Sequence, residues 1–123
     1  MSAKPCPCGG TDYADCCGHY HGGIPAPDAL SLMRSRYSAY VLKLADYLLA
    51  TWHQSTRPAT LDLETDKWLG LEVKNHTEES PDRATVEFVA RYKIDGRAHR
   101  LHEISRFVRV EGRWFYVDGD FPG

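Results

Sequence analysis

The sequence predicts an α+β fold in which a curved antiparallel sheet packs on one long helix, behind a small cysteine-rich segment. Apolar residues recur at three- and four-residue steps between residues 28 and 52, as on one face of a helix. The rest of the chain contains four strand-like stretches, at residues 68–79, 84–94, 97–110 and 113–119. All four cysteines precede these elements, between residues 6 and 17. A long helix followed by successive antiparallel strands is typical of α+β domains.

Length and composition indicate one globular domain with a small appendage. The chain has 123 residues, of which 42% are apolar and 11% aromatic, as expected of a protein with its own hydrophobic core. The 15 basic and 17 acidic residues give a net charge of −2, so a nucleic-acid partner is not expected. No stretch reaches the roughly 18 apolar residues of a membrane helix. The opening "MSAKPCPCGG" has no apolar signal region, so we expect a cytoplasmic protein with reduced cysteines.

The chain divides at a linker that contains glycine and proline. Residues 1–23 are rich in Cys, Gly and His and have almost no large aliphatic side chains, so they cannot form a hydrophobic core alone. Residues 22–27, "GGIPAP", combine flexible glycines with stiff prolines, which is typical of a linker. We therefore expect a metal-binding unit at residues 1–23 and a larger α+β domain at residues 28–123.

The helix is expected to begin at Asp28 and to continue to about Trp52. Asp28 is a suitable N-cap, because its side chain can accept a hydrogen bond from the first turn, and Pro58 sets the outer limit. The apolar face of this helix consists of Leu30, Met33, Tyr37, Tyr40, Val41, Leu44, Tyr47 and Leu48. We expect this face to pack into the concave side of the sheet.

The first two strands are expected to alternate between core and solvent. One face of the first strand carries Leu69, Leu71 and Val73, and one face of the second carries Val86, Phe88, Ala90 and Tyr92. Asp95-Gly96 then predicts a type I′ hairpin turn, and Glu111-Gly112 is a second turn signal.

Alternation in the third strand places a carboxylate among apolar neighbours. The inward set is expected to be Leu101, Glu103, Ser105 and Phe107, and the outward set His102, Ile104, Arg106 and Val108. Glu103 would then lie between helix and sheet, in surroundings typical of a general base. An ion pair with Arg34 or Arg36 from the helix is the favoured alternative, since it would neutralise the buried charge.

The four cysteines predict a metal site rather than disulfides or a redox pair. Cys16 and Cys17 are adjacent, so bridging them would strain the disulfide. Crossed pairing with Cys6 and Cys8 is geometrically feasible but unexpected in a reducing compartment. The C-x-C spacing also differs from the C-x-x-C of thioredoxin-like proteins. Four thiolates at about 2.3 Å would complete the coordination of a zinc ion, so we expect Cys6, Cys8, Cys16 and Cys17 to hold a structural metal.

The cysteine pattern is similar to a known motif. "CPCG…YADCCG" resembles the SEC-C motif at the C-terminus of the SecA translocation motor, although the interval between Cys8 and Cys16 is one residue shorter. The stretches "LMRSRYSAYVLKLADYLLATWH", "WLGLEV", "FVARY" and "SRFVRVEGRWFYVDGD" extend the resemblance to the YchJ-like family of bacterial SEC-C proteins. This resemblance implies a cystatin-like fold of the nuclear transport factor 2 superfamily and a bound metal, usually zinc, with iron conceivable. His19 and His21 are expected to be exposed linker residues rather than ligands.

The resemblance also implies a protein partner. In the translocation motor the motif is a docking element that contacts the chaperone SecB and the ribosome. Residues 1–24 of this chain contain one lysine, Lys4, and two aspartates, Asp12 and Asp15, which give a net charge of −1 and disfavour phosphate binding. Family members often carry a second SEC-C motif near the C-terminus, whereas this sequence has no further cysteine. We therefore expect a single metal-stabilised module that docks to a protein of the chaperone or secretion machinery.

The alternative function is small-molecule binding or catalysis in a pocket between helix and sheet. The superfamily that the chain resembles includes isomerases and hydrolases with an acid or base in that pocket, and Glu103 is the candidate base. We expect the pocket to be lined by Arg34, Arg36, Tyr37, Trp52, Glu103, Ser105, Arg106, Trp114, Tyr116 and Asp118. For Asp118, capping of a turn before Gly119 is the favoured alternative. The sequence has no Ser-His-Asp spacing, P-loop or dinucleotide fingerprint, so we predict no reaction.

Overall fold

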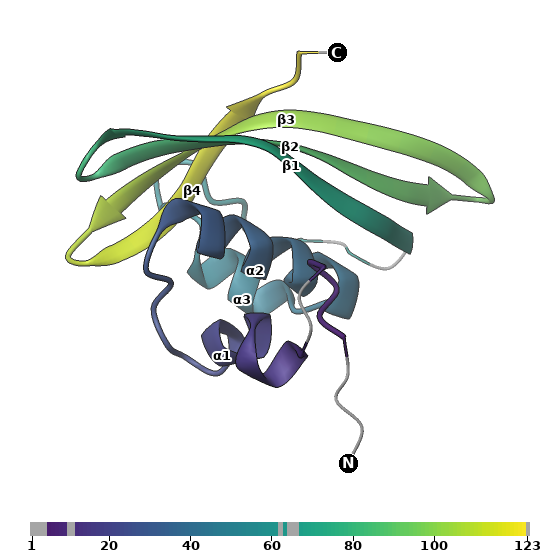
Figure 1. Cartoon of the computed structure of the whole chain (residues 1–123), viewed down its shortest axis with the longest axis horizontal. Helices are drawn as coiled ribbons and strands as arrows, with labels where there is room; N and C mark the ends of the chain where they lie inside the picture. The colour runs from purple at the N-terminus through teal and green to yellow at the C-terminus, as the bar shows by residue number, and fades with distance from the viewer. Residues whose placement is uncertain (1–4, 10–11, 62, 64–66, 123) are drawn as a thin grey trace.

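The computed structural model describes residues 5–9, 12–61, 63 and 67–122. It contains a short 3-10 turn η1 and three α-helices, followed by four strands: η1 (Tyr13–Asp15), α1 (Cys17–His21), α2 (Ala29–Leu42), α3 (Ala45–Ala50), β1 (Lys67–Ser80), β2 (Arg83–Ile94), β3 (Arg97–Val110) and β4 (Arg113–Asp120). The predicted α+β class is therefore confirmed (Figure 1). None of the helices within the described ranges combines the length and hydrophobicity that a bilayer crossing requires.

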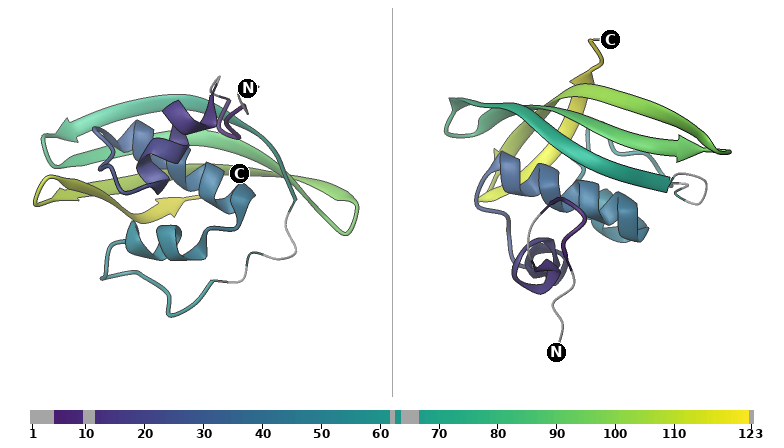
Figure 2. Two further views of the ribbon diagram at one scale, coloured as in Figure 1. Left: turned by 90° about the horizontal axis from the view of Figure 1, so that it is seen from below. Right: turned by 45° about the vertical axis from the view of Figure 1, so that its right-hand side comes forward.

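The strands form one antiparallel sheet in the order β1-β2-β3-β4. Asp95 and Gly96 both have positive φ, of 52° and 79°, as the type I′ turn between β2 and β3 requires. The sheet curves over α2, which lies against its concave face (Figure 1). On the other side of α2 lies the cysteine-rich segment, so that α2 is the middle layer of the molecule (Figure 2).

The helix predicted for residues 28–52 is in fact two helices. Asp28 caps α2 as expected, since its Oδ1 accepts a hydrogen bond of 2.7 Å from the backbone N–H of Ser31. The helix ends at Lys43, which has a left-handed φ of 63°. The N–H of Leu44 donates to the carbonyl of Ala39 at 2.8 Å, which is the long hydrogen bond of a Schellman motif. No glycine or proline marks this break, so the apolar pattern does not reveal it.

A bulge in β1, the first of three register shifts in this strand, changes which of its residues face the core. Trp68 pairs with Tyr92 while Gly70 pairs with Arg91, so Leu69 is left without a partner in the register. Leu69 is 47% exposed, whereas Trp68 packs against the core together with Leu71 and Val73. The predicted face is therefore wrong for Leu69.

The predicted faces of β2 and β3 are confirmed. Val86, Phe88 and Ala90 are buried on the concave side, and so are Glu103, Ser105 and Phe107 opposite them. In β4, a bulge at Val117 places Tyr116 opposite Phe107 but moves Asp118 opposite Arg106, on the outer face. The concave face therefore receives a polar group from β3 and a tyrosine from β4.

The cysteine-rich segment shares one core with the rest of the molecule. Cys6, Cys8 and Cys17 belong to the same cluster of buried side chains as Leu32 and Phe107. The segment thus packs on α2 rather than lying apart from it, and its geometry can affect the helix that faces the sheet.

Candidate functional site

The four cysteine sulphurs converge on one point. All four Sγ atoms lie within 4.8 Å of one another, with 3.6 Å between Cys8 and Cys16 and 4.0 Å between Cys16 and Cys17. Sulphurs placed tetrahedrally at about 2.3 Å from a metal ion are about 3.8 Å apart, whereas a disulfide requires about 2.05 Å. None of these four cysteines forms a disulfide, and this set of atoms could hold a metal ion.

Two local turns bring the sulphurs together. The N–H of Gly9 donates to the carbonyl of Cys6 at 3.0 Å, and Gly9 has a φ of 103° that other residues rarely adopt. On the second side, Asp12 caps η1 by accepting from the N–H of Ala14 at 3.1 Å. Cys16 follows η1 directly, and α1 begins at Cys17. Each pair of cysteines is therefore positioned by its own backbone turn.

The environment of the thiols suits a cation better than a free nucleophile. Burial, together with neighbouring thiols, raises the pKa of Cys16 to about 11. The pKa of Cys17 is also raised, first by its hydrogen bond with Cys8 and then by burial. Thiols with raised pKa values stay protonated at neutral pH, and a bound divalent cation reverses this by stabilising the thiolates.

The cysteine-rich segment is attached to α2 by polar contacts. The Sγ of Cys6 lies 3.5 Å from the hydroxyl of Ser38, which is completely buried. Arg34 donates from Nη1 to the carbonyl of Cys8 at 3.1 Å. Arg34 was predicted to line the pocket, but it lies on the side of α2 that holds the cysteines.

His21 connects the segment to both helices. The hydroxyl of Tyr13 donates to Nδ1 of His21 at 2.6 Å, and Nε2 of His21 donates to the carbonyl of Ser35 at 2.7 Å. The ring also packs edge-on against Tyr47, at 4.6 Å between centroids. Burial lowers the pKa of His21, although its hydrogen bond to Ser35 opposes this. Both ring nitrogens are engaged, so the expectation of an exposed linker residue is wrong for His21, whereas His19 is exposed.

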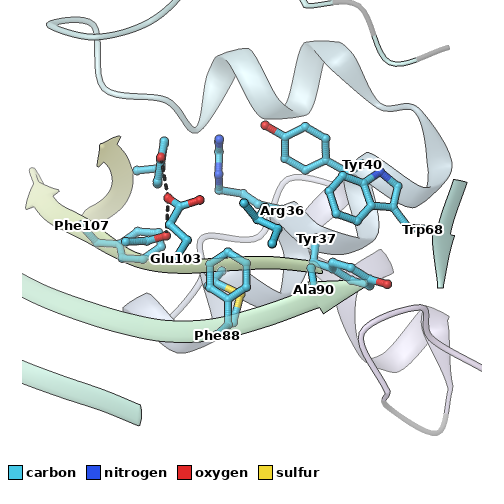
Figure 3. A pocket seen from close by; sticks show the side chains of 12 residues that line it. Arg36, Tyr37, Tyr40, Trp68, Phe88, Ala90, Glu103 and Phe107 are labelled. Atoms are coloured by element: carbon cyan, nitrogen blue, oxygen red, sulfur yellow. Dashed lines mark hydrogen bonds between the residues drawn. The ribbon is translucent and has the colours of Figure 1, made fainter. Parts of the chain in front are cut away.

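A cavity of about 180 Å³ lies between α2 and the concave face of the sheet. Most of its wall is aromatic or aliphatic, and two charged side chains interrupt it (Figure 3). These are Arg36, which is 5% exposed, and Glu103, which is 7% exposed. The lining residues are Met33, Arg36, Tyr37, Tyr40, Trp68, Phe88, Ala90, Leu101, Glu103, Ser105, Phe107 and Tyr116.

Glu103 is held by two hydroxyl groups rather than by an arginine. Its Oε2 accepts hydrogen bonds from Ser105 at 2.8 Å and from Tyr116 at 2.7 Å. Burial and the nearby carboxylate raise the pKa of Tyr116, which keeps its hydroxyl protonated as a donor. Among the described residues, Glu103 forms no ion pair with Arg34 or Arg36, so the favoured prediction of such a pair is wrong. Its Oε1 accepts no hydrogen bond from that part of the chain.

The guanidinium of Arg36 is fixed at one of its nitrogens. Nη1 donates to the carbonyl of Leu48 at 2.8 Å and to the hydroxyl of Thr51 at 2.7 Å. The group lies 5.0 Å from the ring centre of Trp52 and 4.7 Å from that of Tyr116. Within the described ranges, Nε and Nη2 of Arg36 make no hydrogen bond.

The two charged groups lie near each other at one end of the cavity (Figure 3). Burial lowers the pKa of Arg36, and nearby tyrosines and the carboxylate of Glu103 oppose that effect. An arginine keeps its proton at neutral pH even when it is buried. The wall therefore presents a fixed cation and a carboxylate, each with hydrogen-bonding capacity that no described residue uses.

Half of the predicted pocket residues lie elsewhere. Trp52 contacts Arg36 but does not line this cavity. Trp114 lines a second cavity, of about 200 Å³, next to the segment between α1 and α2. Arg106 and Asp118 form an ion pair of 2.6 Å on the outer face of the sheet. This position contradicts both predictions for Asp118, the pocket and the turn cap. The bulge at Val117 places the side chain of Asp118 on the outer face of the sheet, opposite Arg106.

Sequence reasoning missed several lining residues. It placed Met33, Phe88, Leu101 and Phe107 in the core but did not assign them to the pocket. Trp68 was considered as a ligand-site residue, with packing in the core as the favoured alternative, and it reaches the cavity because of the bulge at Leu69. Gly70, which follows the bulge, is the signal that could have revealed it, because an isolated glycine in a strand often marks a bulge.

Comparisons with known proteins agree with this architecture. Residues 28–119 match the family model described as YchJ, middle NTF2-like domain. A UPF0225 protein of Methylibium petroleiphilum is 61% identical over 119 residues, covering 94% of this chain and 88% of its own length. A UPF0225 protein of Ralstonia nicotianae is 57% identical, covering 94% and 90% respectively.

Two solved structures have the same fold over nearly the whole chain. The solution structure of a SEC-C motif containing protein from Rhodopseudomonas palustris has a TM-score of 0.85 and 35% identity, covering 98% of this chain and 100% of that one. The crystal structure of a SEC-C motif containing protein from Psychrobacter arcticus has a TM-score of 0.78 and 32% identity, covering 100% and 84%.

Proposed function

The chain belongs to the YchJ-like UPF0225 family, and on this premise we propose that it is a zinc-stabilised small-molecule-binding protein. In this proposal Cys6, Cys8, Cys16 and Cys17 hold one zinc ion. The ion fixes the cysteine-rich segment on α2, and α2 forms one wall of the ligand cavity. The observation that carries the proposal is the buried carboxylate of Glu103 near Arg36 on that wall: two hydroxyls hold its Oε2, while its Oε1 accepts no hydrogen bond from the described residues.

Zinc is the metal that best fits the donor set. Four thiolates in a tetrahedral arrangement are typical of structural zinc sites, and the sulphur separations of 3.6 and 4.0 Å suit that geometry. A four-sulphur set leaves no coordination position for a substrate. The ion would therefore stabilise the fold rather than take part in a reaction.

The segment needs such an ion because it contributes little hydrophobic surface. Residues 5–24 contain one large aliphatic side chain, Ile24, which is 49% exposed. In small units of this kind the free energy of metal binding supplies much of the free energy of folding. Thiolate ligands also require reducing conditions, so the proposal places the protein in the cytoplasm.

The cavity supports the ligand-binding part of the proposal. Burying a charged group costs free energy, and a buried charged group in a cavity that keeps unused hydrogen-bonding capacity is a candidate for a function. The volume of about 180 Å³ is slightly larger than the roughly 150 Å³ of an engineered cavity that accepts benzene. A single-ring molecule is therefore the size that fits.

Metal content tests the first half of the proposal. The full chain is purified without chelators, and its zinc and iron are measured beside those of Cys16→Ser and His19→Gln. We expect one zinc ion per chain in the parent protein and in His19→Gln, whose side chain is exposed. We expect most of the zinc to be lost in Cys16→Ser. Absence of bound metal from the parent protein would contradict the proposal.

Binding of a simple aromatic probe tests the second half. Toluene is titrated into the metal-loaded full chain, and amide chemical shifts report which residues respond. We expect shifts at the residues that line the cavity and their loss in Ala90→Leu, which fills it. Thr85→Leu, on the outer face of the same strand, is the matched control and should bind toluene as the parent does.

Docking to a protein is a second candidate function, favoured by the charge of the cysteine-rich segment. The described residues between 5 and 24 include no lysine or arginine, and Asp15 is exposed. Such a surface does not suit a phosphate backbone, so a chaperone such as SecB fits better than ribosomal RNA. Co-sedimentation of the full chain with purified SecB and with ribosomes, compared with Asp15→Lys, tests this candidate.

A further inference from the structure

We propose that the cavity selects a small neutral cyclic amide, in which a ring N–H lies next to a ring carbonyl. This inference rests on the proposed ligand-binding function of the cavity. It adds the chemical class of the ligand. This class follows from the charges and the unused hydrogen-bonding groups of the cavity wall and from the volume of the cavity.

The charges of the wall favour a neutral ligand. Arg36 and Glu103 are the only charged side chains that line the cavity among the described residues, and their charges are opposite. The remaining lining residues with polar side-chain atoms are neutral: one serine, three tyrosines and Trp68. An anion would interact well with Arg36 but would be repelled by Glu103, and a cation would show the reverse preference. A molecule without net charge avoids both penalties.

The unused hydrogen-bonding groups define the edge of the ligand. Glu103 offers Oε1 as an acceptor, because Oε2 is already bonded to Ser105 and Tyr116. Arg36 offers donors at Nε and Nη2, because Nη1 is already bonded to Leu48 and Thr51. The ligand must therefore donate to a carboxylate and accept from a guanidinium at the same end of the cavity. An amide edge, with N–H and C=O side by side, supplies both.

The shape of the cavity favours a flat ring. Its wall contains the aromatic rings of Tyr37, Tyr40, Trp68, Phe88 and Phe107, which pack favourably against a planar partner. About 180 Å³ accommodates one ring with its substituents. Arg36 also contacts two aromatic rings, those of Trp52 and Tyr116, and such preorganised groups lose little entropy on binding.

The test compares four probes on the metal-loaded full chain: 2-pyridone, N-methyl-2-pyridone, benzoate and toluene. Binding is followed by amide chemical shifts, and dissociation constants are fitted from the titrations. We expect 2-pyridone to bind with a dissociation constant of about 1 mM or tighter. N-methylation removes the donor but keeps the carbonyl and the ring, so it should weaken binding about tenfold. Benzoate, which is anionic, should also bind about tenfold more weakly than 2-pyridone.

A pair of variants tests the role of the carboxylate. Glu103→Gln removes its charge, and we expect it to weaken 2-pyridone binding about fivefold or more, and to weaken it more than it weakens toluene binding. Glu87→Gln is the matched control, because Glu87 pairs with His102 on the outer face of the neighbouring strands. It should bind both probes as the parent protein does. If Glu103→Gln fails to fold, the comparison of the two pyridones on the parent protein decides.

The outcomes separate the ligand class from the function of the cavity. Equal affinities for 2-pyridone and its N-methyl derivative would overturn the cyclic-amide proposal, and so would tighter binding of benzoate. In both cases the binding function of the cavity would stand, because toluene tests it independently. Failure of every probe to shift the lining residues would contradict the binding function itself.

Discussion

The carboxylate of Glu103 on β3 occupies the space that a side chain at Gly119 on β4 would need. An ideal Cβ at position 119 would lie 2.8 Å from both Cγ and Cδ of Glu103, closer than real Cβ contacts allow. Gly119 does not have a positive φ, so the requirement for glycine here comes from packing. The absence of a side chain on one strand thus makes room for the buried carboxylate of its neighbour.

Gly119→Ala should therefore destabilise the protein by about 1–3 kcal/mol, the usual cost of forcing an extra group into a packed site. Gly70→Ala is the matched control, because a Cβ at Gly70 meets nothing within 4 Å. It should change the free energy of unfolding by less than about 0.5 kcal/mol. Urea denaturation of the metal-loaded proteins measures both values. Equal effects of the two substitutions would show that Glu103 is not packed against β4 as described.

Removal of the Tyr116 hydroxyl tests the hydrogen bond to Glu103. Tyr116→Phe keeps the ring contacts but deletes the 2.7 Å hydrogen bond to a buried carboxylate, so we expect a loss of about 2 kcal/mol in unfolding free energy. Tyr92→Phe is the control, since the hydroxyl of Tyr92 bonds to no other described residue. A Tyr116→Phe protein as stable as the parent would show that this hydrogen bond contributes nothing.

His21 should make stability depend on pH. Burial lowers its pKa below the value of about 6.5 expected in the unfolded chain. Above that pH both states are neutral at His21 and the full stability is present. As the pH falls below it, the unfolded chain gains a proton before the folded protein does, so the unfolding free energy decreases by up to about 1.4 kcal/mol per pH unit.

The measurement compares unfolding between pH 7.5 and 5.5 at saturating zinc for the parent, His21→Gln and His19→Gln. The parent and His19→Gln should lose stability more steeply than His21→Gln, because His21 is half-buried with both ring nitrogens bonded, whereas His19 is exposed. Identical slopes for all three proteins would exclude His21 as the titrating group.

Ser38 should strengthen metal binding without being a ligand. Its hydroxyl lies 3.5 Å from the sulphur of Cys6 and lowers the pKa of Cys17, against the larger opposing effects there. Loss of such an outer-shell partner usually reduces metal affinity about tenfold or more. Ser38→Ala should therefore release zinc to a competing chelator at about tenfold lower chelator concentration. Ser55→Ala, on an exposed loop, should behave as the parent.

The regular parts of the fold could be predicted from the sequence because their physics is local. The faces of β2 and β3 follow from strict alternation, and this placed Glu103, Ser105 and Phe107 on the concave side correctly. Asp28 marks the start of α2 through its side-chain oxygen. In each case a residue type and its spacing are sufficient to determine the structure.

The irregular parts could not be predicted because hydrophobic periodicity assumes an uninterrupted helix or strand. The bulges at Leu69 and Val117 each shift a strand by one residue, and so bring Trp68 into the cavity and send Asp118 to the outer face. The left-handed conformation of Lys43 divides the helix although lysine does not favour it. Alternation places Ser105 on the concave face beside Glu103, but it does not decide which polar group bonds to the carboxylate, which explains why an arginine was predicted where two hydroxyls are found.

The central claim is that four sulphurs of the cysteine-rich segment bind one zinc ion. X-ray absorption at the zinc edge of the purified full chain tests it most directly, because it counts the ligands and measures their distances. The account predicts four sulphur neighbours at about 2.3 Å and no nitrogen neighbour. A histidine nitrogen among the atoms bound to zinc would contradict it. So would a protein whose cysteines are paired as disulfides and that binds no zinc.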